Sequence, residues 1–154
     1  IGGIGSMKRA ILALFASLVA LVLVASPAFA AAQKVDLLKY AGPGNPPLVV
    51  GFATIATNNG NNQIIASITL KNAYVSTQYA VFMEVDSETD PHYLGSLTTN
   101  NKGKWGGEFA FKALQTEGEH SVSLRLRAMN PDGSFQNSRA DIYCYAITVS
   151  IAGS

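Results

Sequence analysis

Short runs in which apolar and polar residues alternate recur along most of this chain, and they constrain its fold more than any other feature. Residues 120–129 form the clearest run, with Val122, Leu124 and Leu126 on one face and polar or charged residues between them. Because successive side chains of a β-strand point to opposite faces, this pattern predicts a strand with one buried and one wet face. No helical period of useful length is present after Ala32.

Seven such runs are predicted as strands, and residues that favour turns separate them. They cover residues 48–57, 64–71, 78–86, 93–99, 107–112, 120–129 and 142–151. In the last run, the alternation predicts that Tyr143 and Tyr145 face inward together with Ile147, Val149 and Ile151. One wet face on nearly every strand favours antiparallel pairing. The sequence therefore predicts an all-β, antiparallel, immunoglobulin-like sandwich of about seven strands, with a small barrel as the alternative.

A secretory signal peptide is predicted over residues 7–30. Lys8 and Arg9 supply its positive start, an apolar run of 16 residues follows, and Ala28-Phe29-Ala30 is a typical cleavage site. The apolar run is shorter than the roughly 20 residues that cross a bilayer, which favours cleavage over a retained helical anchor. We therefore expect a secreted, extracellular protein, or a periplasmic one if the host has an outer membrane.

The predicted boundaries follow from composition. Residues 1–6 precede a plausible initiator Met7 and are interpreted as an upstream extension, and residues 31–47 as a Pro/Gly-rich lead-in, since residues 41–47 hold three prolines and two glycines. The β-sandwich domain is expected over residues 48–154. Cleavage after Ala30 leaves nine basic and ten acidic residues, a net charge of −1, which argues against a nucleic-acid partner.

An acidic run is the densest cluster of metal-ligand atoms in the sequence. Its members occupy every second position: Glu84, Asp86, Glu88, Asp90 and His92. Pro91 and Leu97 stand where a calcium-binding EF-hand loop requires glycine and glutamate. We interpret the run as a solvated hairpin loop and keep calcium binding by the Asp86-Glu88-Asp90 loop as an alternative.

The two histidines, His92 and His120, begin different predicted strands and are expected to face solvent. A zinc site that joins them to Glu119 or Asp90 is the weaker alternative. The sequence thus predicts no metal ligands and no cofactor.

Nucleophilic catalysis has little support in the sequence. Gly133-Ser134-Phe135 lacks the second glycine and the strand-to-helix setting of a nucleophile elbow. Cys144 is the single cysteine, and it is interpreted as a buried packing residue, with an intermolecular disulfide as the alternative. We predict no catalytic residues and a protein that is not an enzyme.

The single tryptophan, Trp105, lies in a glycine- and lysine-rich turn over residues 102–107. We favour the interpretation that its indole caps one end of the core. The alternative is that Trp105, with Lys102 and Lys104 beside it, forms a contact point for a glycan or a protein partner.

Two motifs resemble those of a known group of proteins. Residues 68–81 read ITLKNAYVSTQYAV, and residues 94–122 contain LGSLTTN, then Gly103, Gly106 and the pair Phe109 and Phe111, then Gly118 and His120 before Val122. Both resemble motifs of small secreted immunoglobulin-like sandwich proteins of bacteria and archaea, most of them uncharacterised. The resemblance implies structural roles: a hairpin turn at Gly103 and Gly106, core positions for Tyr79 and the two phenylalanines, turn contacts for residues 98–101, and packing for His120. It supplies no catalytic residue.

These observations predict a secreted, non-enzymatic β-sandwich module that acts by surface contact, in adhesion, envelope association or protein binding. One alternative is a subunit that polymerises by donating the segment 35–50 as a strand to a neighbour. Another is a glycan- or calcium-dependent binding module. The expected partner is a protein or a cell-envelope glycan, with no membrane contact after the signal peptide is removed.

Overall fold

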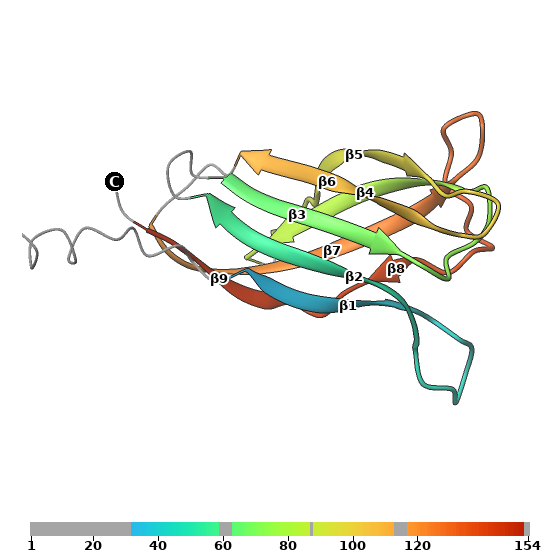
Figure 1. Cartoon of the computed structure of the whole chain (residues 1–154), viewed down its shortest axis with the longest axis horizontal. Coiled ribbons are helices and arrows are strands. Elements are labelled where there is room, and N and C mark those ends of the chain that lie inside the picture. The colour runs from blue at the N-terminus through green and yellow to red at the C-terminus, as the bar shows by residue number, and fades with distance from the viewer. Residues whose placement is uncertain (1–31, 59–62, 87, 113–116, 153–154) are drawn as a thin grey trace, which may run out of the picture.

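The computed structural model describes residues 32–58, 63–86, 88–112 and 117–152 (Figure 1). The predicted upstream extension and signal peptide lie outside the described residues. The described residues form nine strands: β1 (Gln33–Lys39), β2 (Leu48–Asn58), β3 (Gln63–Leu70), β4 (Gln78–Val85), β5 (His92–Thr98), β6 (Trp105–Lys112), β7 (Gly118–Met129), β8 (Ile142–Tyr143) and β9 (Ile147–Ile151). Within these ranges, no helix has the length and apolarity needed to cross a membrane.

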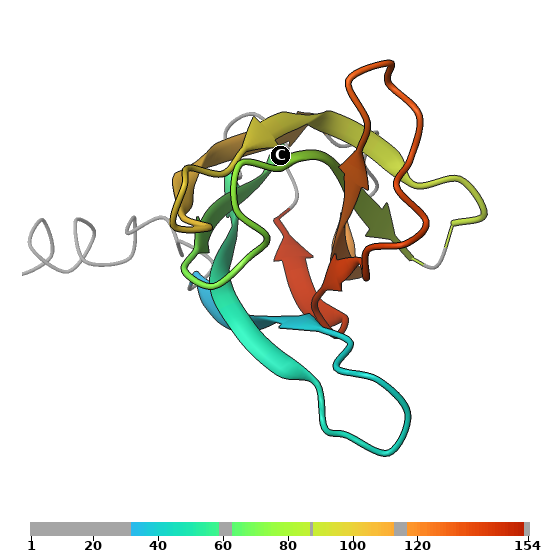
Figure 2. The ribbon, with the colours of Figure 1, turned by 90° about the vertical axis from the view of Figure 1, so that its right-hand side faces the viewer.

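All strand pairings are antiparallel, so the predicted all-β antiparallel fold is confirmed. The strands follow the order β5-β4-β7-β8-β1-β2-β3-β6, and β9 pairs with β7 beyond β8. Seen along the strands, this sheet curls around its own core and nearly closes into a barrel (Figure 2).

Aromatic rings lie at the seam where the curled sheet nearly closes. Strands β5 and β6 stand at the two ends of the strand order. The His92 ring of β5 lies 4.5 Å from the Phe111 ring of β6, centroid to centroid. On β6, the Trp105 and Phe109 rings stack with centroids 5.6 Å apart. Side-chain packing therefore contributes to closing the seam.

The core consists of alternate residues from the long strands, as the sequence pattern predicts. The largest fully buried side chains include Leu37, Ile55, Ile64, Ile68, Leu70, Tyr79, Met83, Leu124, Leu126 and Ile142. The Tyr79 hydroxyl stays inside this core because it accepts a hydrogen bond of 3.3 Å from the backbone N–H of Tyr74. The buried face predicted for β7 is confirmed, and β3 and β4 bury alternate residues in the same way.

Strand β1 comes from the segment predicted as a lead-in. It pairs with β2 along its length and with β8 at its end, and Leu37 is fully buried. The physical reason is local alternation, since apolar Val35 and Leu37 alternate with charged Lys34 and Asp36. The proline- and glycine-rich residues 41–47 form the connection from β1 to β2.

The last predicted strand is interrupted, and the predicted inward position of its two tyrosines is wrong. Strands β8 and β9 are separated by residues 144–146. Ile142 of β8 and Cys144, the first residue of the interruption, are buried, whereas Val149 and Ile151 are buried after it. The interruption therefore shifts the alternation by one residue, and such a shift moves every preceding side chain to the other face. Tyr145 is 66% exposed as a result.

Candidate functional site

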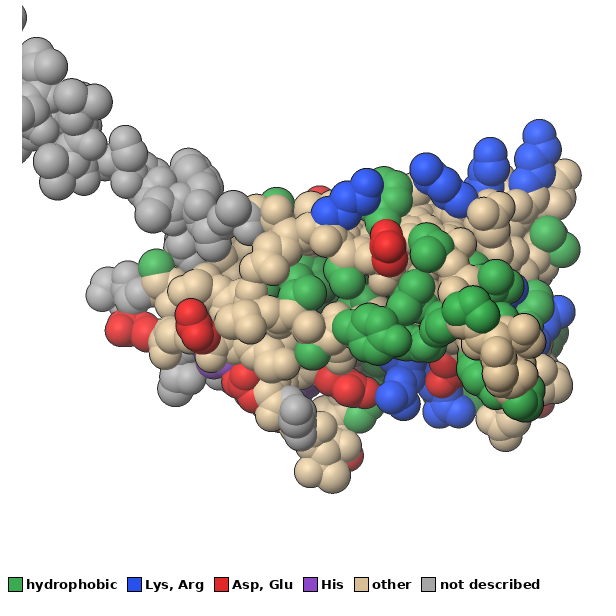
Figure 3. Space-filling view, turned by 90° about the horizontal axis from the view of Figure 1, so that it is seen from below, with side chains coloured by type: hydrophobic (Ala, Val, Ile, Leu, Met, Phe, Trp, Pro, Cys, Tyr) green, Lys and Arg blue, Asp and Glu red, His purple; other side chains and the backbone are tan. Residues whose placement is uncertain are grey.

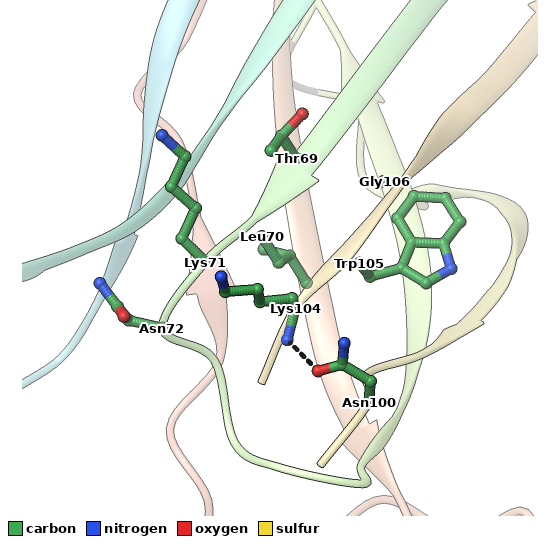
Figure 4. Close-up of a pocket in the computed structure, with 8 residues that line it drawn as sticks. All are labelled: Thr69, Leu70, Lys71, Asn72, Asn100, Lys104, Trp105 and Gly106. Atoms are coloured by element: carbon green, nitrogen blue, oxygen red, sulfur yellow. Dashed lines mark hydrogen bonds between the residues drawn. The ribbon is translucent and has the colours of Figure 1, made fainter. Parts of the chain in front are cut away.

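A groove lies on the outer surface where β3 ends and β6 begins (Figure 4). It has a volume of about 740 Å³ and is lined by Thr69, Leu70, Lys71, Asn72, Asn100, Lys104, Trp105 and Gly106. We call it the lysine groove, because the amino groups of Lys71 and Lys104 stand on the same side of it in Figure 4.

The turn between β5 and β6 fixes the position of Lys104. The Asn100 side-chain oxygen accepts hydrogen bonds from the backbone N–H groups of Lys102, at 2.9 Å, and of Lys104, at 3.0 Å. Gly103 has a φ of +68°, a conformation that side chains with a Cβ rarely adopt. The predicted turn roles of Gly103 and Asn100 agree with this geometry.

Backbone contacts with β2 fix the position of Lys71 and Asn72 in the groove. The N–H groups of Lys71 and Asn72 donate to the carbonyl oxygen of Val50, at 2.8 Å and 3.2 Å. The Lys71 amino group lies 5.5 Å from the centre of the Phe52 ring, and the Lys34 amino group lies 4.3 Å from the same ring. These cation–π contacts extend the basic surface from the groove onto β1.

Four lysines lie at one end of the domain, and five acidic residues lie at the other. The end that holds the turn from β5 to β6 carries the lysines Lys39, Lys71, Lys102 and Lys104. Figure 3 shows Lys and Arg side chains along one edge of the molecule. The acidic residues Asp86, Glu88, Asp90, Glu117 and Glu119 lie at the other end, between β4 and β5 and at the start of β7. The near-neutral net charge therefore conceals a basic surface.

Trp105 contributes to the groove by packing. Its indole is half-buried, stacks on Phe109 and lies over Gly107, where a Cβ atom would stand 2.4 Å from the indole. Figure 4 shows that the ring points away from Lys104, on the other side of the strand. The geometry favours the capping interpretation, while the neighbouring lysines supply the polar surface.

The structure separates the two histidines. His120 is only 7% exposed, so the expectation that it faces solvent is wrong: its Nδ1 lies 2.6 Å from Oδ2 of Asp86, at the end of β4. His92 instead pairs with Glu88. Each histidine contacts a different carboxylate. The alternative zinc site, in which both histidines meet Glu119 or Asp90, is therefore not assembled in this structure.

The carboxylates of the acidic run also diverge. Glu84 contacts Arg125, whereas Asp86 contacts His120 and accepts a hydrogen bond of 2.9 Å from the N–H of Ser121. These hydrogen bonds hold the pKa of Asp86 below its usual value, the His120 bond contributing most. Among the residues the structure describes, no three His, Cys, Asp or Glu side chains form a group able to hold a metal ion.

Cys144 is buried beside β7, at 5% exposure. Its sulfur accepts a hydrogen bond of 3.2 Å from the N–H of Leu124, and burial raises the pKa of the thiol. A buried, protonated thiol is a poor nucleophile. Ser134 lies in an exposed turn, where its hydroxyl donates to Asp132 at 2.6 Å.

Sequence reasoning identified Lys102 and Lys104 but missed Lys34 and Lys71. These lysines belong to three separate segments of the chain, and only strand pairing brings them to one surface. No local spacing rule signals such convergence. In the sequence, only the position of Trp105 next to Lys102 and Lys104 indicated a basic surface.

Comparison with known proteins gives no identification. No protein-family model matches the chain, and neither the curated proteins nor the solved structures include a similar one.

Proposed function

We propose that this protein is a secreted, non-enzymatic module that acts by surface contact, and that its lysine groove binds a negatively charged cell-envelope glycan. One observation carries the proposal: Lys71 and Lys104 line the groove, and a neighbouring hollow that shares Lys71 and Asn72 with it is lined by Phe52, Lys34 and Asp36. Three ammonium groups along one surface suit a ligand with repeated negative charges, and not a single small anion.

The polar residues of the groove suit a sugar backbone between those charges. Thr69 offers a hydroxyl group and Asn72 a side-chain amide, and both can donate and accept hydrogen bonds. The lysines are exposed or partly exposed, so their attraction for an anion is screened by salt within about 8–10 Å. Binding should therefore weaken strongly as ionic strength rises.

The immunoglobulin-like description and the secreted location form part of this proposal. The path of the chain supports it, because the chain passes repeatedly between strands β1-β2-β3-β6 and strands β5-β4-β7-β9, which lie across the core from each other in one curled sheet and are joined through β8 (Figure 2). The predicted signal peptide supports export.

The strand-donating and calcium-dependent alternatives gain no support from the geometry. The first part of the segment considered for strand donation already pairs with β2 and β8 of its own chain. The Asp86 and Glu88 carboxylates that a calcium site would need face separate histidines.

The test compares binding of the purified chain to dextran sulfate and to uncharged dextran of the same length, by isothermal titration calorimetry. We expect binding to dextran sulfate alone, and a loss of affinity as salt is raised from about 50 to 500 mM. The double variant Lys71→Gln/Lys104→Gln should weaken binding at least about tenfold, because it removes the two positive charges that line the groove.

A matched control removes a positive charge elsewhere. Arg125→Gln on β7 lowers the net charge outside the groove and should change the affinity less than about twofold. Equal binding of the two polymers, or a double variant that binds as tightly as the unaltered chain, would contradict the proposal.

A further inference from the structure

A second hollow lies at the interruption between β8 and β9. It has a volume of about 450 Å³, and the residues that define its chemistry are Glu84, Ser123, Arg125, Asp141, Tyr143 and Tyr145. We call it the tyrosine hollow. Strands β1, β2 and β3 separate β8 from β6 in the sheet, so the tyrosine hollow and the lysine groove are different surfaces. Its volume falls within the roughly 300–1,000 Å³ of small-molecule sites.

Two tyrosine rings form one wall of the tyrosine hollow. Their centroids are 6.0 Å apart and their planes make an angle of 79°, which gives the wall a corner. Tyr145 is 66% exposed, although burial of such a ring is ordinarily favourable. Figure 3 shows hydrophobic side chains gathered on the face that β1, β8 and β9 present. Exposed aromatic surface beside polar groups is typical of binding sites.

The polar wall offers hydrogen-bond donors and acceptors side by side. Arg125 Nη2 lies 3.5 Å from Glu84 Oε1, and the Ser123 hydroxyl lies 3.5 Å from Glu84 Oε2. These contacts are at the long limit of hydrogen bonding, so the groups keep capacity for a ligand. A sugar hydroxyl both donates and accepts hydrogen bonds. The Arg125 guanidinium can donate to it, and the Glu84 carboxylate can accept from it.

The charges around the tyrosine hollow are balanced. Arg125 faces Glu84, and Arg127 Nε lies 3.7 Å from Asp141 Oδ1. Two carboxylates thus stand against two guanidinium groups, and a ligand with a net charge of either sign gains little there. This distinguishes the site from the lysine groove.

We propose that the tyrosine hollow binds a neutral sugar ring, specifically a pyranose with equatorial hydroxyl groups. Such a ring has a flat face of C–H bonds that stacks on Tyr145, while the hydroxyl groups at its edge reach Arg125 and Glu84. The site is independent of the proposed anionic ligand, and it makes the domain a module with two different glycan contacts.

The test titrates the full chain with cellohexaose, xylohexaose and chitohexaose by calorimetry and by tyrosine difference absorbance. We expect at least one of them to bind with a dissociation constant of millimolar or below, with an affinity that salt hardly changes. Tyr145→Ala should weaken that binding at least about tenfold, as is common for a central aromatic contact. Tyr93→Ala is the matched control, since Tyr93 is 60% exposed on β5, outside the hollow, and its loss should leave the affinity unchanged.

The lysine variant separates this proposal from the proposed function. Lys71→Gln/Lys104→Gln should weaken dextran sulfate binding at least about tenfold yet leave oligosaccharide binding as it is. The second site is refuted if none of the three oligosaccharides binds, if Tyr145→Ala and Tyr93→Ala have equal effects, or if the lysine variant also loses the neutral sugar. Binding of dextran sulfate is read separately and decides only the proposed function.

Discussion

Replacing Gly103 with alanine tests how the turn between β5 and β6 supports the lysine groove. Gly103 has a φ of +68°, and a Cβ atom built on it would stand 2.1 Å from the carbonyl oxygen of Ala73. The obstacle is backbone and not a flexible side chain, so the turn must move. The hydrogen bond of 3.1 Å from the Ala73 N–H to the Gly103 carbonyl lies at the same contact.

The expected cost has two parts. A residue other than glycine in the left-handed region costs about 1 kcal/mol. Displacing the turn loses the hydrogen bond from Ala73, which is worth about 1 kcal/mol, and part of the nearby packing. The sum is about 2–3 kcal/mol, which corresponds to a fall of roughly 10 °C in the melting temperature of a domain of this size.

Alanine variants of two other glycines separate the cost of the left-handed backbone from the cost of the contact with Ala73. The stability of all three variants is measured by urea unfolding and by thermal melting. Gly44 has a φ of +76° but no described atom within 4 Å of its Cβ position, so Gly44→Ala should cost only about 1 kcal/mol. Gly106 has neither a positive φ nor a close neighbour, so Gly106→Ala should change stability by less than about 0.5 kcal/mol.

The order of the melting temperatures of the three variants shows whether the contact with Ala73 restrains the turn. If Gly103→Ala melts no lower than Gly44→Ala, the contact with Ala73 does not restrain the turn, and the account of how Lys104 is positioned is refuted. Dextran sulfate affinity of the folded Gly103→Ala chain, measured below its melting temperature, should also fall, because Lys104 follows directly after the displaced residue.

Three further predictions concern the rest of the fold. Leu37→Ala should destabilise the chain by about 2–5 kcal/mol in urea unfolding, because Leu37 is fully buried; a negligible loss would place β1 outside the cooperative domain. Because the pKa of Asp86 is lowered in the folded state, its contribution to stability is present near neutral pH and is lost as pH falls through that pKa. Asp86→Asn should remove this acid-dependent part of the free energy of unfolding, which unfolding curves at a series of pH values measure. The effect should be below about 1 kcal/mol, because the carboxylate is half-exposed. Cys144 should react with a thiol reagent only as fast as the domain opens, and reaction at the rate of a free thiol would show that it is accessible.

The candidate site was only partly predictable from sequence. A turn at Gly103 with turn contacts from residues 98–101 was predicted, and Asn100 and Gly103 have the roles in this turn that asparagine and glycine commonly have. The tyrosine hollow was not predictable, because an unbroken alternation through residues 142–151 places Tyr143 and Tyr145 inside. Where a strand breaks depends on which neighbours it pairs with, and here β8 pairs with β1 and β7 whereas β9 pairs with β7 beyond it.

Most of the strands, and the alternate burial along β3, β4 and β7, follow from the amino-acid sequence alone, because the twofold alternation of a strand is a local property of consecutive residues. Only the tertiary structure decided which surfaces assemble from distant segments. It added β1 to the sheet, brought Lys34, Lys71 and Lys104 to one side, and buried His120 against Asp86. The physical reason is that these contacts depend on the pairing and register of strands far apart in the chain, which no local pattern encodes.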